Sequence, residues 1–162
     1  MFEIEDTTDL PKPERYASLI AQAGGLFAGE RDAIANAANL AALIYHGLPE
    51  LNWAGFYLYK NGELVLGPFQ GKPACIRIAL GRGVCGTAAA TRSTQLVIDV
   101  HEFPGHIACD AASNSEIVVP LVAGERLIGV LDLDSPKRAR FDADDRAGLE
   151  HLAALWVAAS DV

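Results

Sequence analysis

The pair Asn61-Gly62 limits the possible folds of this chain more than any other feature of its sequence. It stands between two runs of apolar and aromatic residues, NWAGFYLYK over residues 52–60 and ELVLGP over 63–68. Asparagine and glycine tolerate the positive φ angles of a two-residue turn, so Asn-Gly between such runs is the strongest short hairpin signal. The sequence therefore predicts two antiparallel strands here and a sheet that is built from hairpins.

Apolar periodicity and the positions of glycine and proline predict the other elements. The expected helices lie over residues 12–29, 31–46, the end of 81–93, and 142–160, the last of them capped by Asp142. The further expected strands lie over 74–79, 95–98, 116–122 and 127–134, and a long loop over 99–115. Hairpins between terminal helices predict an α+β fold, with a central antiparallel sheet of about six strands and helices mainly on one face.

The length and composition favour one globular domain. With 162 residues, of which 51% are hydrophobic, the chain can bury a sizeable core. We expect a single domain over residues 1–162, with a helical part at about 12–46, the sheet and the site at about 52–134, and a C-terminal helix at about 142–160.

The charge of the chain narrows the range of partners. A formal net charge of −8 argues against binding to nucleic acid or to anionic membranes, which both favour basic patches. No uncharged apolar run reaches the roughly 20 residues of a membrane span. The acidic N-terminus, MFEIEDTTDLPKPERY, lacks the basic and apolar regions of a secretory signal, so a cytoplasmic location is expected.

Three cysteines, Cys75, Cys85 and Cys109, form an odd set that does not indicate a framework of structural disulfides. Cys75 lies in ACIRIA, where strand alternation would place it on the face of Arg77 and Ala79. Cys85 follows the glycines of GRGVCG at an expected helix start, where free N–H groups favour a thiolate. Cys109 lies in the polar stretch GHIACDAASNSE, an unusual setting for a core cysteine.

Several kinds of chemistry are open to these thiols besides inert burial. A zinc site would use the pair in HIAC, but no Cys-x2-Cys spacing supports it and no metal is expected. A hydrolase would need a nucleophile and a base, and nothing specifies the pair among Cys85, Cys109, His101, His106 and His151. Redox chemistry accommodates more of the sequence, because an attacking thiolate becomes a sulfenic acid and a second thiol then closes a disulfide.

Asp132 and Asp134 lie two residues apart in an expected strand and therefore share one face of the sheet. Two like charges on one face are costly unless a cation or a shared proton meets them, so they indicate a pocket for an ammonium group or a solvated strand end. Glu116 could join them. However, a two-residue turn at Gly124-Glu125 would put Ile117 opposite Asp132, so Glu116 joins only if it precedes the regular strand or a β-bulge intervenes.

Four segments together closely resemble the free methionine-(R)-sulfoxide reductases, which are single-domain enzymes of the GAF fold. These segments are NWAGFYLY, LGPFQGKPACIRIALGRGVCGTAA, DVHEFPGHIACDAASNSEIVVPL, and IGVLDLDS followed by RFDADD. The resemblance covers nearly the whole chain and is weakest before about residue 45. The blocks GRGVCGTA and HIACDAASNSE are specific, since most GAF regulatory domains lack this arrangement of three cysteines.

The resemblance implies a role for each cysteine. Cys109 matches the cysteine that attacks the sulfoxide sulfur and becomes a sulfenic acid, and Cys75 matches the main resolving cysteine. Cys85 matches a third cysteine of disulfide exchange or substrate contact, and the residues alone do not decide which resolving cysteine dominates. Thioredoxin is the usual reductant and the family forms dimers, so the resemblance implies a thioredoxin-dependent homodimer without a cofactor.

The resemblance also implies how the substrate is held. Glu116, Asp132 and Asp134 match acids that bind the substrate amine and assist protonation of the sulfoxide oxygen, and Trp53 matches an aromatic residue near the substrate methyl group. A GAF fold would place this pocket under loops, on the sheet face opposite most of the helices.

We therefore expect thiol-dependent reduction of free L-methionine (R)-S-oxide to L-methionine through a sulfenic acid and an intramolecular disulfide. The alternative from another class is a non-catalytic GAF sensor that binds a small ligand and dimerises, which would normally be fused to an output domain. A general thiol peroxidase is a third possibility. Under the first hypothesis, the loop around residues 101–115 should move between the reduced and the disulfide form.

Overall fold

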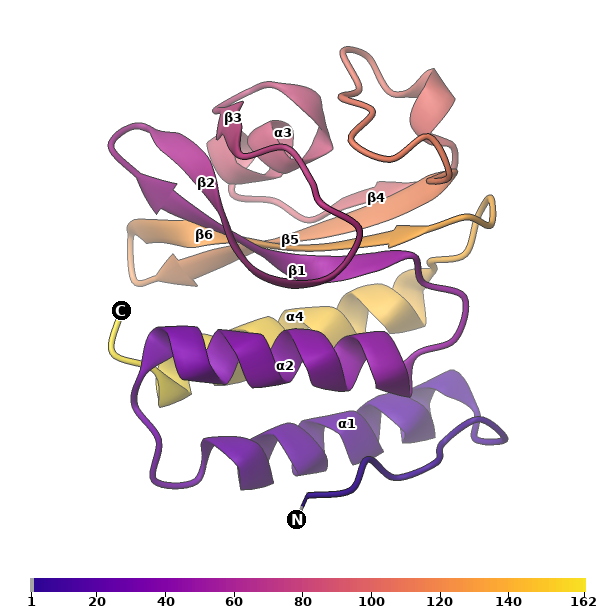
Figure 1. Cartoon of the computed structure of the whole chain (residues 1–162), viewed down its shortest axis with the longest axis vertical. Helices are drawn as coiled ribbons and strands as arrows, with labels where there is room; N and C mark the ends of the chain where they lie inside the picture. Colours follow the sequence, from indigo (N-terminus) through magenta and orange to yellow (C-terminus); the bar gives the residue numbers. More distant parts are fainter. Residues whose placement is uncertain (1) are drawn as a thin grey trace.

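The computed structural model describes residues 2–162 and shows three helices on one side of a sheet and one helix on the other (Figure 1). The helices are α1 (Lys12–Phe27), α2 (Ala33–Gly47), α3 (Gly83–Thr91) and α4 (Ala143–Ala159). The strands are β1 (Trp53–Lys60), β2 (Glu63–Gly71), β3 (Arg77–Ala79), β4 (Gln95–Val97), β5 (Ser115–Ala123) and β6 (Arg126–Ser135). Within this part of the chain, no helix is both long and apolar enough to cross a lipid bilayer.

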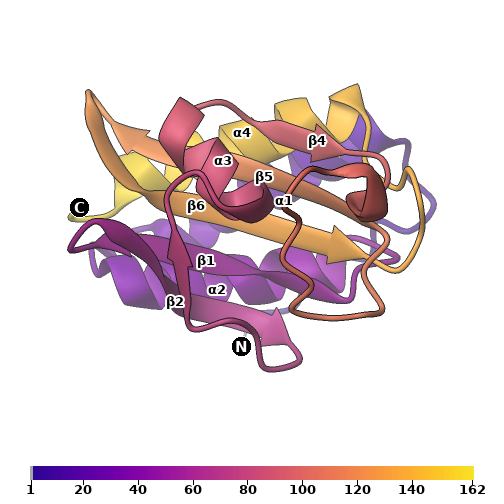
Figure 2. The ribbon, with the colours of Figure 1, turned by 90° about the horizontal axis from the view of Figure 1, so that it is seen from above.

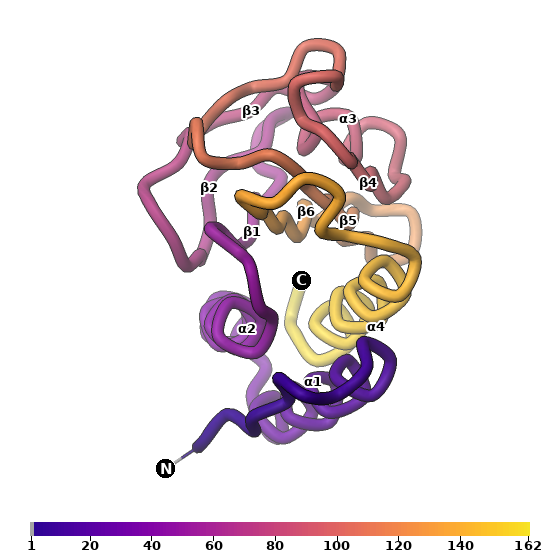
Figure 3. Tube along the Cα trace, turned by 90° about the vertical axis from the view of Figure 1, so that its right-hand side faces the viewer, coloured from indigo at the N-terminus to yellow at the C-terminus, as the bar shows by residue number. Residues whose placement is uncertain are grey.

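The six strands form one antiparallel sheet in the order β3-β2-β1-β6-β5-β4. Helices α2 and α4 cover one face of this sheet, and α1 packs beneath both of them (Figures 1 and 3). Seen from above, α3 and the long loop that follows β4 lie over the opposite face (Figure 2). The predicted α+β class, the strand number and the placement of most helices on one face are confirmed.

The hairpin of β1 and β2 forms where Asn61-Gly62 predicts it. Asn61 and Gly62 have φ angles of 52° and 91°, and Lys60 pairs with Glu63 across the turn. Both positive φ angles fit the type of two-residue turn that follows the right-handed twist of the strands. This local choice fixes the pairing of β1, which carries Trp53 and lies at the centre of the sheet.

Helix α4 begins at its predicted cap. The Asp142 carboxylate accepts hydrogen bonds from the backbone N–H groups of Asp144 and Asp145, and the Asp145 carboxylate accepts one from the backbone N–H of Asp142. Such a reciprocal capping box satisfies donors that a helix start would otherwise leave free. The helix then packs so closely against α1 that a Cβ atom at Gly148 would lie 2.2 Å from the ring of Tyr16.

The strand that was expected over residues 74–79 is shorter than predicted. Only Arg77–Ala79 pair with β2 as a strand. Just before them, the carbonyl oxygen of Ile76 accepts one hydrogen bond from the Leu66 N–H. Pro73 has no N–H to donate, and the chain leaves β2 at Gly71 before it returns. Cys75 therefore lies in a loop, and its expected place on a strand face with Arg77 and Ala79 is wrong.

Candidate active site

A small cavity lies between the sheet, α3 and the loop that follows β4. Six of the seven residues singled out from the sequence line it, from β1, α3, the loop, β5 and β6, and these are Trp53, Cys85, Cys109, Glu116, Asp132 and Asp134. The seventh, Cys75, is covalently joined to the cavity by its bond to Cys109. Residues that are up to 81 positions apart in the sequence thus meet at one place, on the sheet face opposite α2 and α4 (Figure 2).

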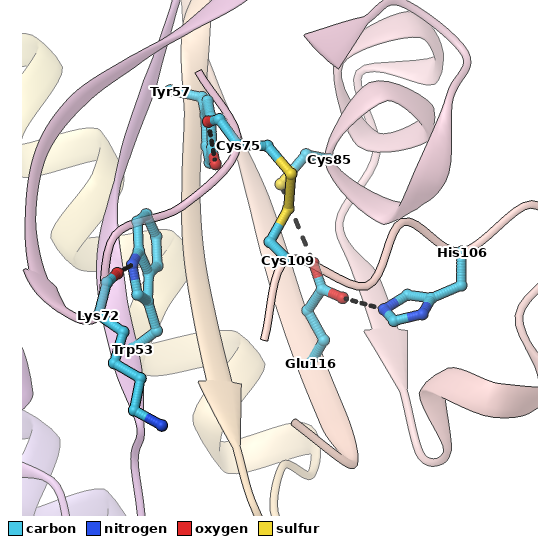
Figure 4. The surroundings of a disulfide bond; sticks show 8 residues. All are labelled: Trp53, Tyr57, Lys72, Cys75, Cys85, His106, Cys109 and Glu116. Atoms are coloured by element: carbon cyan, nitrogen blue, oxygen red, sulfur yellow. Dashed lines mark hydrogen bonds and ion pairs between the residues drawn. A yellow bond between two sulfur atoms is a disulfide. The ribbon is translucent and has the colours of Figure 1, made fainter. Parts of the chain in front are cut away.

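The structure contains a disulfide bond between Cys75 and Cys109, while Cys85 is free and buried (Figure 4). The two bonded cysteines are 34 residues apart in sequence, and their Cα atoms are 5.7 Å apart. The Tyr57 hydroxyl donates a hydrogen bond to the carbonyl oxygen of Cys75 (2.9 Å), which fixes the loop that carries this cysteine. Of the two cysteines that could pair with Cys109, the structure joins it to Cys75.

A β-bulge brings Glu116 onto the face of the two aspartates. Near the β5–β6 turn Val122 pairs with Leu127, but Leu121 pairs with Gly129, so β6 contains one extra residue. Beyond this irregularity Glu116 pairs with Asp134. The bulge is the condition under which the sequence allowed Glu116 to join the acids, and the structure fulfils it.

The three acids lie together, with Glu116 and Asp132 buried and Asp134 half-buried, and their pKa values are raised. Burial, followed by the charges of Asp132 and Asp134, raises the pKa of Glu116 well above its usual range. Burial raises the pKa of Asp132 to about 6, although hydrogen bonds with Cys85 and Glu116 oppose the shift. Burial and the charge of Asp132 also raise the pKa of Asp134. At neutral pH the cluster therefore retains protons that it can donate.

One carboxylate oxygen of this cluster has no partner. Asp132 is 5% exposed, and within the described residues its Oδ1 atom accepts no hydrogen bond. A buried acceptor without a donor costs free energy, so such atoms commonly mark the place of a ligand or of water. Asp132 thus offers this oxygen, within the cavity, as an acceptor for a donor such as an ammonium group.

Cys85 does not have the expected tendency to form a thiolate. It lies in the first turn of α3, but it is fully buried next to Glu116, with 3.9 Å between its Sγ and a Glu116 carboxylate oxygen. Burial, and after it the charges of Asp132 and Glu116, raise the pKa of the Cys85 thiol well above its usual range. The prediction that free N–H groups would favour the thiolate is wrong, because burial and the acids outweigh the helix start.

Trp53 forms one wall of the site. Its ring stacks on Phe69 and Tyr57, with centroid distances of 5.2 and 5.9 Å, and its Nε1 donates to the carbonyl oxygen of Lys72 (3.2 Å). Stacking and this hydrogen bond hold the indole in one orientation beside the cavity (Figure 4). The wall can therefore contact an apolar group that enters from the loop side.

His106 is a site residue whose place the sequence did not reveal. From the sequence it is a candidate only for a hydrolase base or a zinc ligand. The structure places its Nε2 3.7 Å from a carboxylate oxygen of Glu116 (Figure 4). Burial lowers the pKa of its imidazole. Its position three residues before Cys109 was the available signal, since both side chains come from one loop over the acids.

The donor atoms that the site brings together are fewer than the four ligands of a structural zinc site. Within residues 2–162, one group of three potential ligands comes together, because the Cys85 sulfur and carboxylate oxygens of Glu116 and Asp132 lie within 4.8 Å of one another. A structural zinc site takes four ligands, and Cys109, which was weighed as a ligand, is used by the disulfide. Carboxylate oxygens accept equally well from an ammonium group.

The cavity is small in this disulfide form. Its volume is about 40 Å³, whereas a cavity of about 150 Å³ holds benzene, a molecule smaller than methionine sulfoxide. The loop lies over the acids because Cys109 is drawn to Cys75. The cavity of the disulfide form therefore leaves little room for an amino-acid substrate.

The fold and the site together define a GAF-type domain with a cysteine pair over a pocket of buried acids. The profile of the GAF domain family matches residues 35–159. The free methionine-R-sulfoxide reductase of Escherichia coli is 57% identical, over 88% of this chain and 87% of that protein. The chain therefore belongs to the GAF domain family and, within it, to the free methionine-R-sulfoxide reductases.

Two solved structures agree with this assignment. The free methionine-R-sulfoxide reductase of Neisseria meningitidis, solved with its substrate, is 43% identical with a TM-score of 0.93, over 98% of this chain and 95% of that one. A Burkholderia vietnamiensis protein, provisionally described as a GAF sensor, is 65% identical with a TM-score of 0.90, over 93% of this chain and 96% of that one. The GAF fold and the family resemblance seen in the sequence are confirmed.

Proposed function

We propose that this protein reduces free L-methionine (R)-S-oxide to L-methionine by thiol chemistry. The observation that carries the proposal is the disulfide between Cys75 and Cys109 at a pocket that contains three acids. The names of the E. coli and N. meningitidis relatives give the substrate and its stereochemistry. Each step of the reaction then has a group on this chain to perform it.

In the first step Cys109 attacks the sulfoxide sulfur. The oxygen passes from the substrate to the cysteine, so that methionine leaves and the Cys109 thiol becomes a sulfenic acid. Protonation of the sulfoxide oxygen makes the sulfur more electrophilic. Glu116 suits this role because its raised pKa keeps a proton available near neutral pH.

In the second step Cys75 resolves the sulfenic acid. Its sulfur attacks the sulfur of Cys109, the S–S bond forms, and the hydroxyl group leaves as water after it takes up a proton. The structure contains the product of this step, a bond between these two residues. The assignment of Cys109 as attacking and Cys75 as resolving cysteine follows the family pattern and the greater exposure of Cys109.

The pocket suits a free amino acid. A free ammonium group can donate to the unpartnered Oδ1 of Asp132, with Asp134 and Glu116 beside it. A methionine inside a peptide chain has an amide in place of this cation and gains less from the acids. Trp53 offers an apolar wall for the methyl group at the other end of the substrate.

The reductant, the assembly and the location belong to the same proposal. Thioredoxin reduces the disulfide after each turnover, the protein is a homodimer, and it works in the cytoplasm, where reduced thiols are maintained. Residues 1–162 form a single GAF domain, which the packing of α1 against α4 supports for the part before the profile match. Analytical ultracentrifugation tests the dimer.

The experiment is NADPH consumption with thioredoxin, thioredoxin reductase and this protein, with free methionine (R)- and (S)-sulfoxide compared. We expect consumption with the R isomer alone and none for Cys109→Ser. Cys75→Ser should form one methionine per protein and then stop, because its sulfenic acid cannot close the bond to Cys75. No reduction of either isomer by folded protein would favour a ligand-binding sensor, and a preference for hydrogen peroxide would favour a peroxidase.

A further inference from the structure

Exposed apolar side chains lie close in the chain to both cysteines of the disulfide, and two of them, Pro73 and Ile107, also line the cavity. Ile76, which directly follows Cys75, is 68% exposed, and Ile107, two residues before Cys109, is 36% exposed. Pro73 is exposed nearby. Since each chain step spans 3.8 Å and the two cysteine Cα atoms are 5.7 Å apart, the Cα atoms of Ile76 and Ile107 are at most about 17 Å apart. We call Pro73, Ile76 and Ile107 the rim patch.

The chain segment that carries Pro73 and Ile76 is basic, although the protein as a whole is acidic. Residues 64–98 carry four cationic side chains and no acidic one, in a chain with a net charge of −8. Lys72 and Arg82 flank Pro73 and Ile76 in the sequence. Both are exposed, and neither forms an ion pair with another described residue. An apolar centre with free cations at its margin is complementary to an acidic protein surface with an apolar centre.

The disulfide must be reduced by a second molecule, a dithiol reductant, that binds at this place. The sulfoxide substrate supplies no electrons, so two electrons and two protons must come from a dithiol. A thiolate of the reductant attacks the sulfur of Cys109, the more exposed cysteine, forms an intermolecular disulfide and releases Cys75, which takes up a proton. The second thiol of the reductant then attacks the reductant sulfur that is bonded to Cys109. This step releases Cys109, and the reductant leaves as a disulfide.

We propose that the rim patch, with Lys72 and Arg82 at its margin, is the docking surface for a protein dithiol of the thioredoxin type whose reactive cysteine lies in an apolar surface with acidic residues around it. This inference rests on the proposed function. It adds where the reductant binds and which residue contributes to its affinity without contributing to the chemistry. Ile76 is that residue, because it is exposed and does not line the cavity.

The test compares two reductants on the same variants. Free methionine (R)-sulfoxide reduction is measured once with thioredoxin and once with dithiothreitol, a small dithiol that needs no docking surface. For Ile76→Glu we expect kcat/KM for thioredoxin to fall at least about tenfold, because the charge opposes both the apolar contact and the acidic partner. The rate with dithiothreitol should stay within about twofold of the wild type, and Ile76→Leu should retain both rates.

A matched control comes from the other side of the sheet. Ile34 is 51% exposed and belongs to α2, which lies on the other side of the sheet from α3 and the long loop (Figure 1), so Ile34→Glu should change neither rate. Raising the salt concentration from about 50 to about 500 mM should lower the thioredoxin rate and not the dithiothreitol rate, since exposed charges are screened.

The two proposals fail differently. A wild-type protein that reduces the sulfoxide with neither reductant defeats the proposed function. A wild-type protein that works with dithiothreitol and not with thioredoxin keeps the proposed reduction of the sulfoxide, but it overturns thioredoxin as the reductant and with it the docking inference. The same holds if Ile76→Glu leaves the ratio of the thioredoxin rate to the dithiothreitol rate unchanged.

Discussion

At the scale of one residue, Asp132 shows that a group placed to bind a substrate can destabilise the substrate-free protein. Its carboxyl group is 5% exposed, faces Glu116, Asp134 and Cys85, and leaves one oxygen without a donor. Its pKa is about 6 in the folded protein, compared with about 3.9 in an unfolded chain. The acid therefore favours its protonated form in the folded state, and its ionisation at neutral pH lowers the free energy of unfolding.

We expect Asp132→Asn to stabilise the substrate-free protein at neutral pH. The cost of ionising Asp132 is absent below about pH 4, grows as the pH rises to about 6, and is constant above that value. The stability of Asp132→Asn relative to the wild type should therefore rise by on the order of 3 kcal/mol between these limits. Urea unfolding at pH 4, 5, 6 and 7.5 measures this difference.

The exposed turn residue Glu125 provides the control for this series. Glu125→Gln should show no comparable change relative to the wild type across the same pH values. The Asp132→Asn protein should at the same time have a raised KM for methionine sulfoxide, because the amide cannot pair with the ammonium group. A constant stability difference at all four pH values would refute the assignment of a raised pKa to Asp132.

At the level of elements, the contact between α1 and α4 depends on one glycine. A Cβ atom at Gly148 would lie 2.2 Å from the ring of Tyr16, whose hydroxyl donates a 2.8 Å hydrogen bond to the buried Asp145. The hydrogen bond fixes the hydroxyl end of the Tyr16 ring, so the ring cannot move away from position 148 without loss of that bond. The two helices can approach this closely only because position 148 has no side chain.

We expect Gly148→Ala to lower the free energy of unfolding by about 1–3 kcal/mol through overpacking, as measured by urea unfolding. The matched control is Gly24→Ala on α1, where a Cβ atom would have no neighbour within 4 Å. Alanine should raise stability there by up to about 1 kcal/mol, because glycine is unfavourable within a helix. Equal effects of the two substitutions would contradict the close helix contact.

Most elements could be predicted from the sequence because their signals are local. The turn at Asn61-Gly62 and the cap at Asp142 each depend on one or two residues and their own backbone, and both are confirmed. The strand over 74–79 failed because its pairing depends on β2, which the local pattern does not describe. The position of Glu116 was open for the same reason, since the bulge near Leu121 results from the pairing of two strands.

The candidate site could likewise be predicted only in part. The structure brings together, at the disulfide and the cavity, all seven residues that the sequence singled out through its family resemblance. It did not show that Cys85 is buried against Glu116, or that His106 reaches the same acid. Both facts depend on how the loop folds over the sheet, and burial of this kind decides the pKa of a thiol.

At the scale of the whole molecule, the sheet separates a layer of three helices from a layer that contains α3, the long loop and the disulfide. The loop after β4 is anchored at its ends, where the N–H of Val100 donates to Asn114 and the Asn52 amide donates to Asp110 and Ser113. Near its centre it is held by the disulfide at Cys109 and by the contact between His106 and Glu116. Loss of the disulfide should therefore release the centre and not the anchors.

We expect reduction to increase amide hydrogen exchange at least about tenfold in residues 101–112, with no change in α2 and α4 on the other face. The disulfide closes a separation of 34 residues, which in the chain-entropy account stabilises the folded state by about 4 kcal/mol, so the oxidised protein should also melt at a higher temperature. Cys75→Ser, which cannot form the bond, should show the fast exchange under oxidising and reducing conditions alike. Equal exchange of this loop in oxidised and reduced wild-type protein would show that the small cavity opens by a movement elsewhere in the molecule.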